Sequence, residues 1–296
     1  MPILSGEDDQ ALRFRGVLLM IAAGVCFTLL DTCAKLLVVE FAALQIVFVR
    51  FFGHLVFTIG SVGRGNLPRL WQTRRPVMMV VRGLLLLGST LGNFMALRYL
   101  ALSETVSILF ASPFLVAILA GPMLGEWIGP RRWIAVLIGF TGVIVVTQPG
   151  TAGFHWAAIY SVAATTSYAF YAIVTRMLAV TDSNAVQQFY ASLIATAALL
   201  PIMPFVWTWP GDLLSIAMMA ATGFFGFLGH SFLITAHRHA PAAILSPFVY
   251  VQIIWMTLFG FLVFDHVPTT ANIVGAGIVV SSGLYLLFRE RRLKGA

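Results

Sequence analysis

Apolar residues fall into ten long runs along the chain, with short polar connections between them. A helix needs about 20 apolar residues to cross the hydrocarbon core of a bilayer, and most of the runs approach that length. Backbone polar groups in lipid must be hydrogen-bonded within their own segment, so we expect all ten runs to be helical. The predicted membrane spans are 16–38, 44–63, 77–97, 103–124, 132–147, 155–178, 184–206, 213–236, 242–263 and 271–288.

The composition also indicates an integral membrane protein. Hydrophobic residues make up 59% of the 296 residues, charged residues make up only 10%, and the mean hydropathy is +0.93. A soluble chain of this length would carry far more charge on its surface. The first 15 residues include acidic side chains and no small-residue cleavage site, so we predict a cytoplasmic segment at 1–15 and no cleaved signal peptide.

The basic residues predict the orientation of the spans. Most of the 18 Lys and Arg residues lie in connections on one side, including the loop GRGNLPRLWQTRRP and the tail RERRLK, whereas the connections of the other side hold Arg98. Lys and Arg accumulate in cytoplasmic loops, so both termini are predicted to be cytoplasmic. This topology explains the net charge of +7 without a nucleic-acid partner. The predicted location is the bacterial inner membrane, in a multi-pass arrangement.

The two halves of the chain resemble each other. Residues 96–133 align with residues 235–272 without a gap, and Glu126 then falls on Asp265. Each half holds five predicted spans, and because five is an odd number, the halves would insert with opposite orientations. We therefore predict an all-α polytopic membrane protein with ten transmembrane helices in two inverted five-helix repeats. After the segment 1–15, the predicted domains are 16–147 (first repeat), 155–288 (second repeat) and 289–296 (basic cytoplasmic tail).

Several stretches resemble a known family. The run ALRYLALSETVSILFASPFLVAILAGPMLGEWIGPRRWIAVLIGFTGVIVV and the later run GAGIVVSSGLYLL are similar to EamA-type members of the drug/metabolite transporter superfamily. Lys35 and Arg50 stand where that family usually has a lysine in its first helix and an arginine in its second. Phe27 stands where many members have a tryptophan. The chain is similar to bacterial members that export aromatic amino acids.

The resemblance implies a secondary, non-ATP transporter that exports amino acids, aromatic ones first, or similar small metabolites. Transport would proceed by alternating access through a central cavity between the repeats. Carriers of another metabolite class, such as a nucleoside, vitamin or cofactor, are the main alternative. An integral membrane enzyme is a further alternative, but its nearest motif is HRH at 237–239, where the first and third side chains face different sides of a helix. We expect no enzymatic activity, no cofactor and no metal site.

Charged side chains inside membrane spans cost free energy, and their presence therefore calls for an explanation. Asp31 and Lys35 are four residues apart on one helix face, where they could neutralise each other. With Arg50 and Glu104 they would form a layer of two acids and two bases on the outer side. This layer either fastens helices together or exchanges partners as a gate opens. A proton-coupling carboxylate at Asp31 or Glu104, with protons as the coupling ion, is a third interpretation.

Polar and aromatic side chains inside the spans are the candidates for a substrate cavity. Arg82 lies on a polar stripe of the third span, where it either snorkels to the cytoplasmic interface or lines a cavity with Asn93. Pro113 interrupts the fourth span and is a candidate hinge. The cavity candidates are Phe27, Asn93, Ser112, Tyr168, Tyr171, His230, Tyr250, Gln252 and Trp255. Tyrosine and tryptophan combine a flat apolar ring with a polar atom, which suits the stacking of an aromatic substrate.

Overall fold

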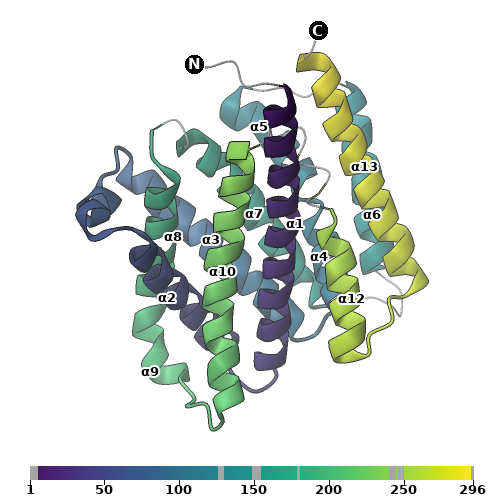
Figure 1. Ribbon diagram of the computed structural model, residues 1–296. Coiled ribbons are helices and arrows are strands. Elements are labelled where there is room, and N and C mark those ends of the chain that lie inside the picture. Colours follow the sequence, from purple (N-terminus) through teal and green to yellow (C-terminus); the bar gives the residue numbers. More distant parts are fainter. Residues whose placement is uncertain are drawn as a thin grey trace.

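The computed structural model describes residues 6–125, 130–148, 155–178, 181–239, 245, 248 and 250–294. These residues form a bundle of helices and contain no strand (Figure 1). The α-helices are α1 (Gly6–Leu37), α2 (Ala43–Ser61), α3 (Pro76–Leu97), α4 (Leu102–Leu109), α5 (Ser112–Leu124), α6 (Pro130–Thr147), α7 (Ala158–Leu178), α8 (Asn184–Leu199), α9 (Met203–Val206), α10 (Leu213–His239), α12 (Gln252–Phe264) and α13 (Thr270–Lys294). Two 3-10 helices, η1 (Arg64–Trp71) and η2 (Leu200–Ile202), lie in the connections.

Seven of the described helical segments are long and apolar enough to cross a membrane. Three shorter apolar helices, Trp133–Thr147, Gln252–Phe264 and Thr270–Tyr285, lie within the remaining predicted spans. The structure therefore confirms an all-helical polytopic membrane protein, while the count of ten spans stays a prediction. Most of the first half of the predicted span 242–263 lies outside the described residues, as does Glu126.

The helices differ from the predicted spans in several places. The predicted span 103–124 is two helices, because α4 ends at Leu109 and α5 begins at Ser112. Pro113 has no N–H and clashes with the preceding turn, but it fits well in the first turn of a new helix. At the chain ends, α1 begins at Gly6 and α13 continues to Lys294, so the terminal helices extend into the predicted cytoplasmic segments. The first turn of α1 and the last turn of α13 lie on the same side of the bundle (Figure 1).

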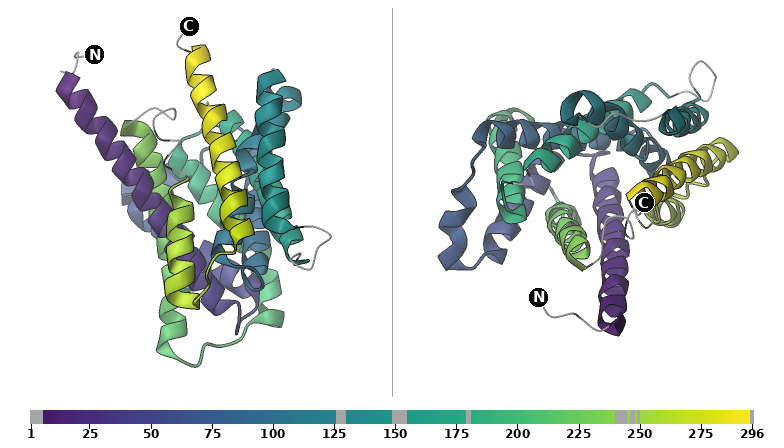
Figure 2. Two further views of the ribbon diagram at one scale, coloured as in Figure 1. Left: turned by 90° about the vertical axis from the view of Figure 1, so that its right-hand side faces the viewer. Right: turned by 90° about the horizontal axis from the view of Figure 1, so that it is seen from above.

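The helices pack in pairs that recur in the two halves of the chain. In chain order, α1, α2, α3 and α6 of the first half correspond to α7, α8, α10 and α13 of the second, and α5 corresponds to α12. The contact of α1 with α10 is matched by that of α7 with α3, and the contact of α2 with α10 by that of α8 with α3. The contact of α1 with α12 is likewise matched by that of α7 with α5. Figure 2 shows α6 and α13 side by side at one edge of the bundle.

A close approach of two glycines fixes the contact between α2 and α10. A Cβ atom added to Gly223 would lie 2.8 Å from the Cα atom of Gly53, which is closer than real Cβ atoms come. Small residues allow helix backbones to pack this tightly inside a membrane, where there is no hydrophobic driving force between helices. The contact holds α2, with Arg50, against the helix that carries His230.

Candidate substrate-binding cavity

A cavity of about 230 Å³ lies among the spans. It is enclosed by helices from both halves of the chain: α1, α2, α3, α4 and α5 from the first, and α7, α10 and α12 from the second. Its lining residues are Met20, Ala23, Gly24, Phe27, Leu30, Asp31, Arg50, Leu86, Ser89, Thr90, Asn93, Phe94, Leu109, Phe110, Ser112, Tyr168, His230, Leu233, Phe248 and Gln252. Six of the nine cavity candidates from the sequence are among them: Phe27, Asn93, Ser112, Tyr168, His230 and Gln252.

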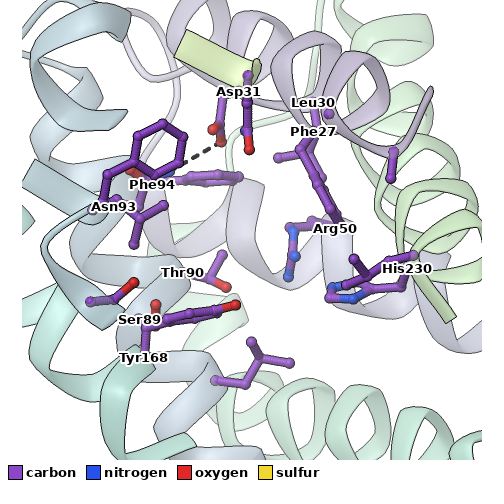
Figure 3. A pocket seen from close by; sticks show the side chains of 18 of the residues that line it. Phe27, Leu30, Asp31, Arg50, Ser89, Thr90, Asn93, Phe94, Tyr168 and His230 are labelled. Carbon is purple, nitrogen blue, oxygen red and sulfur yellow. Dashed lines mark hydrogen bonds between the residues drawn. The ribbon is translucent and has the colours of Figure 1, made fainter. Parts of the chain in front are cut away.

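Two side chains of opposite charge border this cavity. The carboxylate of Asp31 on α1 accepts a hydrogen bond from Nδ2 of Asn93 on α3, with an N···O distance of 3.1 Å. Arg50 extends from α2 into the same space, and Figure 3 shows the Asp31 carboxylate and the Arg50 guanidinium on the cavity wall. The two charges are close enough to attract each other electrostatically. The cavity therefore offers binding partners to both anionic and cationic groups.

Aromatic rings form much of the remaining wall. The Phe27 ring packs edge-on against the His230 ring at a centroid distance of 5.1 Å, and Tyr168 packs on Tyr171 at 5.7 Å. Phe94 and Phe110 add two further rings to the lining. Ring faces of this kind suit the stacking of a flat conjugated group.

The imidazole of His54 lies behind the ring of His230, at a centroid distance of 5.5 Å. Its Nε2 is 3.2 Å from Oε1 of Gln188 on α8. A Cβ atom added to Gly229 would lie 2.8 Å from the Phe27 ring, so the glycine makes room for that ring at the wall. This group connects the cavity wall to helices α2, α8 and α10.

Lys35 and Glu104 do not line the cavity. Nζ of Lys35 donates to the carbonyl oxygen of Leu97, the last residue of α3, at 2.8 Å and to that of Leu100, in the turn that follows, at 2.6 Å. Glu104 accepts from the backbone N–H of Ala101 and from Nδ2 of Asn272. The predicted four-residue charge layer is therefore divided in this structure, with only Asp31 and Arg50 at the cavity.

The prediction that Asp31 and Lys35 neutralise each other is wrong for this structure. Asp31 receives its hydrogen bond from Asn93, whereas Lys35 bonds to backbone carbonyls. The physical reason is that the last carbonyls of a helix have no partner within the helix and carry partial negative charge, which attracts an ammonium group. Lys35 therefore fastens α1 to the end of α3.

Arg82 is 4% exposed and is fully engaged between helices. It donates from Nε to Oγ1 of Thr175 at 2.8 Å, from Nη1 to the carbonyl of Gln187 at 2.7 Å and from Nη2 to the hydroxyl of Tyr171 at 2.7 Å. Its guanidinium also lies over the Tyr171 ring. The side chain neither snorkels nor lines the cavity, because it joins α3 to α7 and α8.

Three cavity candidates lie outside the lining. Tyr171 is held by Arg82, Tyr250 packs edge-on against Phe110, and Trp255 lies beside Gly24.

Sequence reasoning in turn missed Thr90, Phe94 and Phe110. The spacing of Ser89, Thr90, Asn93 and Phe94 places them on one face of α3, which is the signal that would have found the first two of these. Among the described residues, no group of three or more His, Cys, Asp or Glu side chains could hold a metal ion.

The chain has recognisable relatives. The model of the EamA-like transporter family matches residues 14–148 and again residues 155–289. A solved crystal structure that is 18% identical covers 98% of this chain and 99% of its own, with a TM-score of 0.59, and supports the fold. The S-adenosylmethionine uptake transporter of Rickettsia prowazekii is 25% identical over 91% of this chain and 94% of its own length.

Two further relatives have other cargoes in their names. The riboflavin transporter of Rhizobium johnstonii is 24% identical over 94% of this chain and 92% of its own length. The pseudopaline exporter CntI of Pseudomonas aeruginosa is 25% identical over 90% of this chain and 93% of its own length. None of these names supports the expected export of aromatic amino acids, and the alternative of another metabolite class fits them better. Because the family model matches both halves of the sequence, the chain belongs to the EamA-like transporter family.

Proposed function

We propose that this membrane transporter is a secondary carrier of a small metabolite of the cofactor or vitamin class. It works by alternating access and needs no ATP. The observation that carries the proposal is the cavity, which brings opposite charges and aromatic rings together inside the spans. Ligand sites combine an apolar wall with a few polar groups that orient the ligand, and this cavity has that character.

The chemistry of the relatives' cargoes suits this wall. S-adenosylmethionine carries a purine, and riboflavin carries a fused three-ring system, so both present a flat conjugated surface. Phe27, Tyr168 and Phe94 offer ring faces to such a surface, while Ser89 and Thr90 offer hydroxyl groups to its polar edge. An aromatic amino acid would meet the same rings, so it belongs in the test as a third substrate.

The packing of the helices supports an inverted repeat. Contacts between the halves come in matched pairs, such as α1 with α10 and α7 with α3, and the family model matches the chain twice. Secondary transporters with inverted repeats place the substrate near the bilayer midplane and rock one bundle against the other. Pro113, where α4 gives way to α5 at the cavity wall, is the proposed hinge. The positive-inside pattern supports a cytoplasmic position for both termini, in a protein of the bacterial inner membrane.

Transport by purified protein in liposomes tests the proposal. Labelled S-adenosylmethionine, riboflavin and tryptophan would be offered separately to protein-containing and protein-free vesicles, without nucleotide and with or without an imposed proton gradient. We expect saturable flux of at least one of the first two, and competition by its unlabelled form. Stimulation by the gradient would identify proton coupling. Folded protein that moves none of the three, or only tryptophan, would contradict the proposed substrate class.

A further inference from the structure

Arg50 is a buried cation, and two of its three guanidinium nitrogens have no hydrogen-bond partner in the part of the chain that the structure describes. Its side chain is 5% exposed, and Nε and Nη1 are buried without a hydrogen-bond partner among the described residues. A guanidinium carries five N–H donors in a planar fork that matches a carboxylate or phosphate. A charge left in this state inside a membrane bundle is costly, so it marks a site where a ligand completes the bonding.

The packing around Arg50 holds its guanidinium beside the cavity. The guanidinium carbon lies 4.5 Å from the centroid of the Phe51 ring, whose face partly offsets the loss of water. A Cβ atom added to Gly226 would lie 3.8 Å from Nε, so α10 packs close to this part of the Arg50 side chain. The space that remains is the cavity, which Arg50 shares with His230 and Asp31 (Figure 3).

The carboxylate of Asp31, in turn, has fewer hydrogen-bond donors than it can accept. The structure gives its carboxylate one hydrogen bond among the described residues, from Asn93. An ionised carboxylate accepts about four hydrogen bonds, so it retains room for a cationic donor. Arg50 does not fill that room, because its Nε and Nη1 have no hydrogen-bond partner among the residues that the structure describes. The two charges thus border one cavity without neutralising each other by contact.

We propose that Arg50 and Asp31 bind the two ends of a zwitterionic headgroup on the substrate. A carboxylate of the substrate accepts from the Arg50 guanidinium, and an ammonium group of the substrate donates to Asp31, which Asn93 orients. The flat conjugated part then lies against the aromatic wall formed by Phe27 and Tyr168. This inference rests on the proposed function and narrows it to metabolites that carry both charges, such as S-adenosylmethionine, and away from uncharged ones such as riboflavin.

A competition experiment distinguishes the contributions of the substrate's carboxylate and ammonium groups to binding. Uptake of labelled S-adenosylmethionine into proteoliposomes would be inhibited with unlabelled S-adenosylmethionine, with its decarboxylated form, with an analogue lacking the α-amino group, and with 5′-methylthioadenosine. For the wild type we expect removal of the carboxylate to weaken inhibition about tenfold or more, because one charge-assisted hydrogen bond is worth that much in binding. In Arg50→Gln the inhibitory potencies of S-adenosylmethionine and its decarboxylated form should lie within about threefold of each other. The guanidinium that distinguishes the two compounds is then gone.

Asp31→Asn makes the corresponding test for the ammonium group. It should reduce the preference for the compound that carries the amino group and leave the preference for the carboxylate in place. Arg82→Gln is the matched control, because Arg82 is an equally buried arginine that is bonded to protein groups away from the lining. It should lower the melting temperature of the purified protein but keep the ratio between the inhibitors. Stabilisation of each folded variant by S-adenosylmethionine against heat gives a second measure of binding.

The outcomes distinguish this inference from the proposed function. Equal inhibition of the wild type by S-adenosylmethionine and its decarboxylated form overturns the inference, and so does an unchanged ratio in Arg50→Gln. A wild type that carries riboflavin and neither binds nor carries S-adenosylmethionine also overturns it, while the proposed function stands. Folded protein that carries neither compound overturns both.

Discussion

Arg50 and Arg82 are both buried inside the helical bundle, yet their surroundings are opposite. Arg82 donates three short hydrogen bonds, to Thr175, Gln187 and Tyr171, across the contacts of α3 with α7 and α8. Arg50 faces the cavity and has two buried nitrogen atoms without a hydrogen-bond partner in the described part of the chain. One arginine completes a helix contact, and the other leaves a charge available to a ligand.

The comparison shows how one residue type can serve stability or binding. A buried guanidinium with all its partners stabilises the arrangement that supplies them, and removal of the side chain leaves those partners unsatisfied. A buried guanidinium without partners costs free energy until a ligand arrives. Substitutions at the two positions should therefore change the free energy of unfolding in different directions.

The largest effect is expected from Arg82→Met. The substitution removes three hydrogen bonds to a charged group and leaves polar atoms of Thr175, Gln187 and Tyr171 without their donor. We expect the free energy of unfolding to fall by about 3 kcal/mol. Thermal unfolding of purified protein in detergent measures the change. Arg74→Met, at an exposed position before α3, is the control and should leave the melting temperature unchanged. Equal melting temperatures for the two variants would refute the stabilising role of Arg82.

The next largest effect is expected from Gly83→Ala. This variant tests whether the hydrogen bonds of Arg82 depend on the close packing of α3 against α8. A Cβ atom added to Gly83 would lie 2.9 Å from Cβ of Ile194, so Gly83→Ala pushes α8 away together with Gln187. Overpacking of this kind costs about 1–3 kcal/mol. Gly60→Ala is the control, because no atom lies within 4 Å of its added Cβ. Thermal unfolding should show a loss only for Gly83→Ala, and an equal loss in the control would point to a general intolerance of alanine.

A smaller loss is expected from Tyr171→Phe. The variant removes the acceptor of Arg82 Nη2 but keeps the aromatic face beneath the guanidinium, as well as the bonds to Thr175 and Gln187. The free energy of unfolding should fall by about 1 kcal/mol, which denaturation of the purified protein can resolve. Tyr99→Phe, in the half-exposed connection between α3 and α4, should have no measurable effect. A loss as large as that of Arg82→Met would show that the hydroxyl has a further role.

Much of the fold follows from the hydrophobic runs of the sequence. Their length and the requirement for internal backbone bonding predict membrane helices, and the structure confirms an all-helical chain with seven apolar segments of spanning length. The division of the span 103–124 was not predicted, although Pro113 marked the place. A proline signals a disturbance of the helix, but whether the chain kinks or starts a new helix depends on the neighbouring helices, which periodicity does not describe.

The candidate site was predictable only in part. Asn93, Tyr168 and His230 attracted notice as polar groups inside apolar spans, and they line the cavity. The different states of Arg50 and Arg82 could not be read from the sequence. The partners of Arg82 are about 90 to 105 positions away along the chain, and the partners that Arg50 lacks leave no trace in the local pattern. Spacing likewise paired Asp31 with Lys35, because the unpaired carbonyls at the end of α3 appear only once the helices are packed.

The smallest effect, and the one of opposite sign, is expected from Arg50→Met. Methionine fills much of the same space without a charge, and no acceptor among the described residues would lose a bond from Nε or Nη1 of Arg50. In the absence of substrate the free energy of unfolding should therefore stay the same or rise by up to about 1 kcal/mol. The double variant with Asp31→Asn shows whether an isolated Asp31 charge masks this gain, since it removes that charge as well. A fall as large as that of Arg82→Met would mean that Arg50 stabilises the empty protein, and the case for a ligand carboxylate at this position would lose its physical basis.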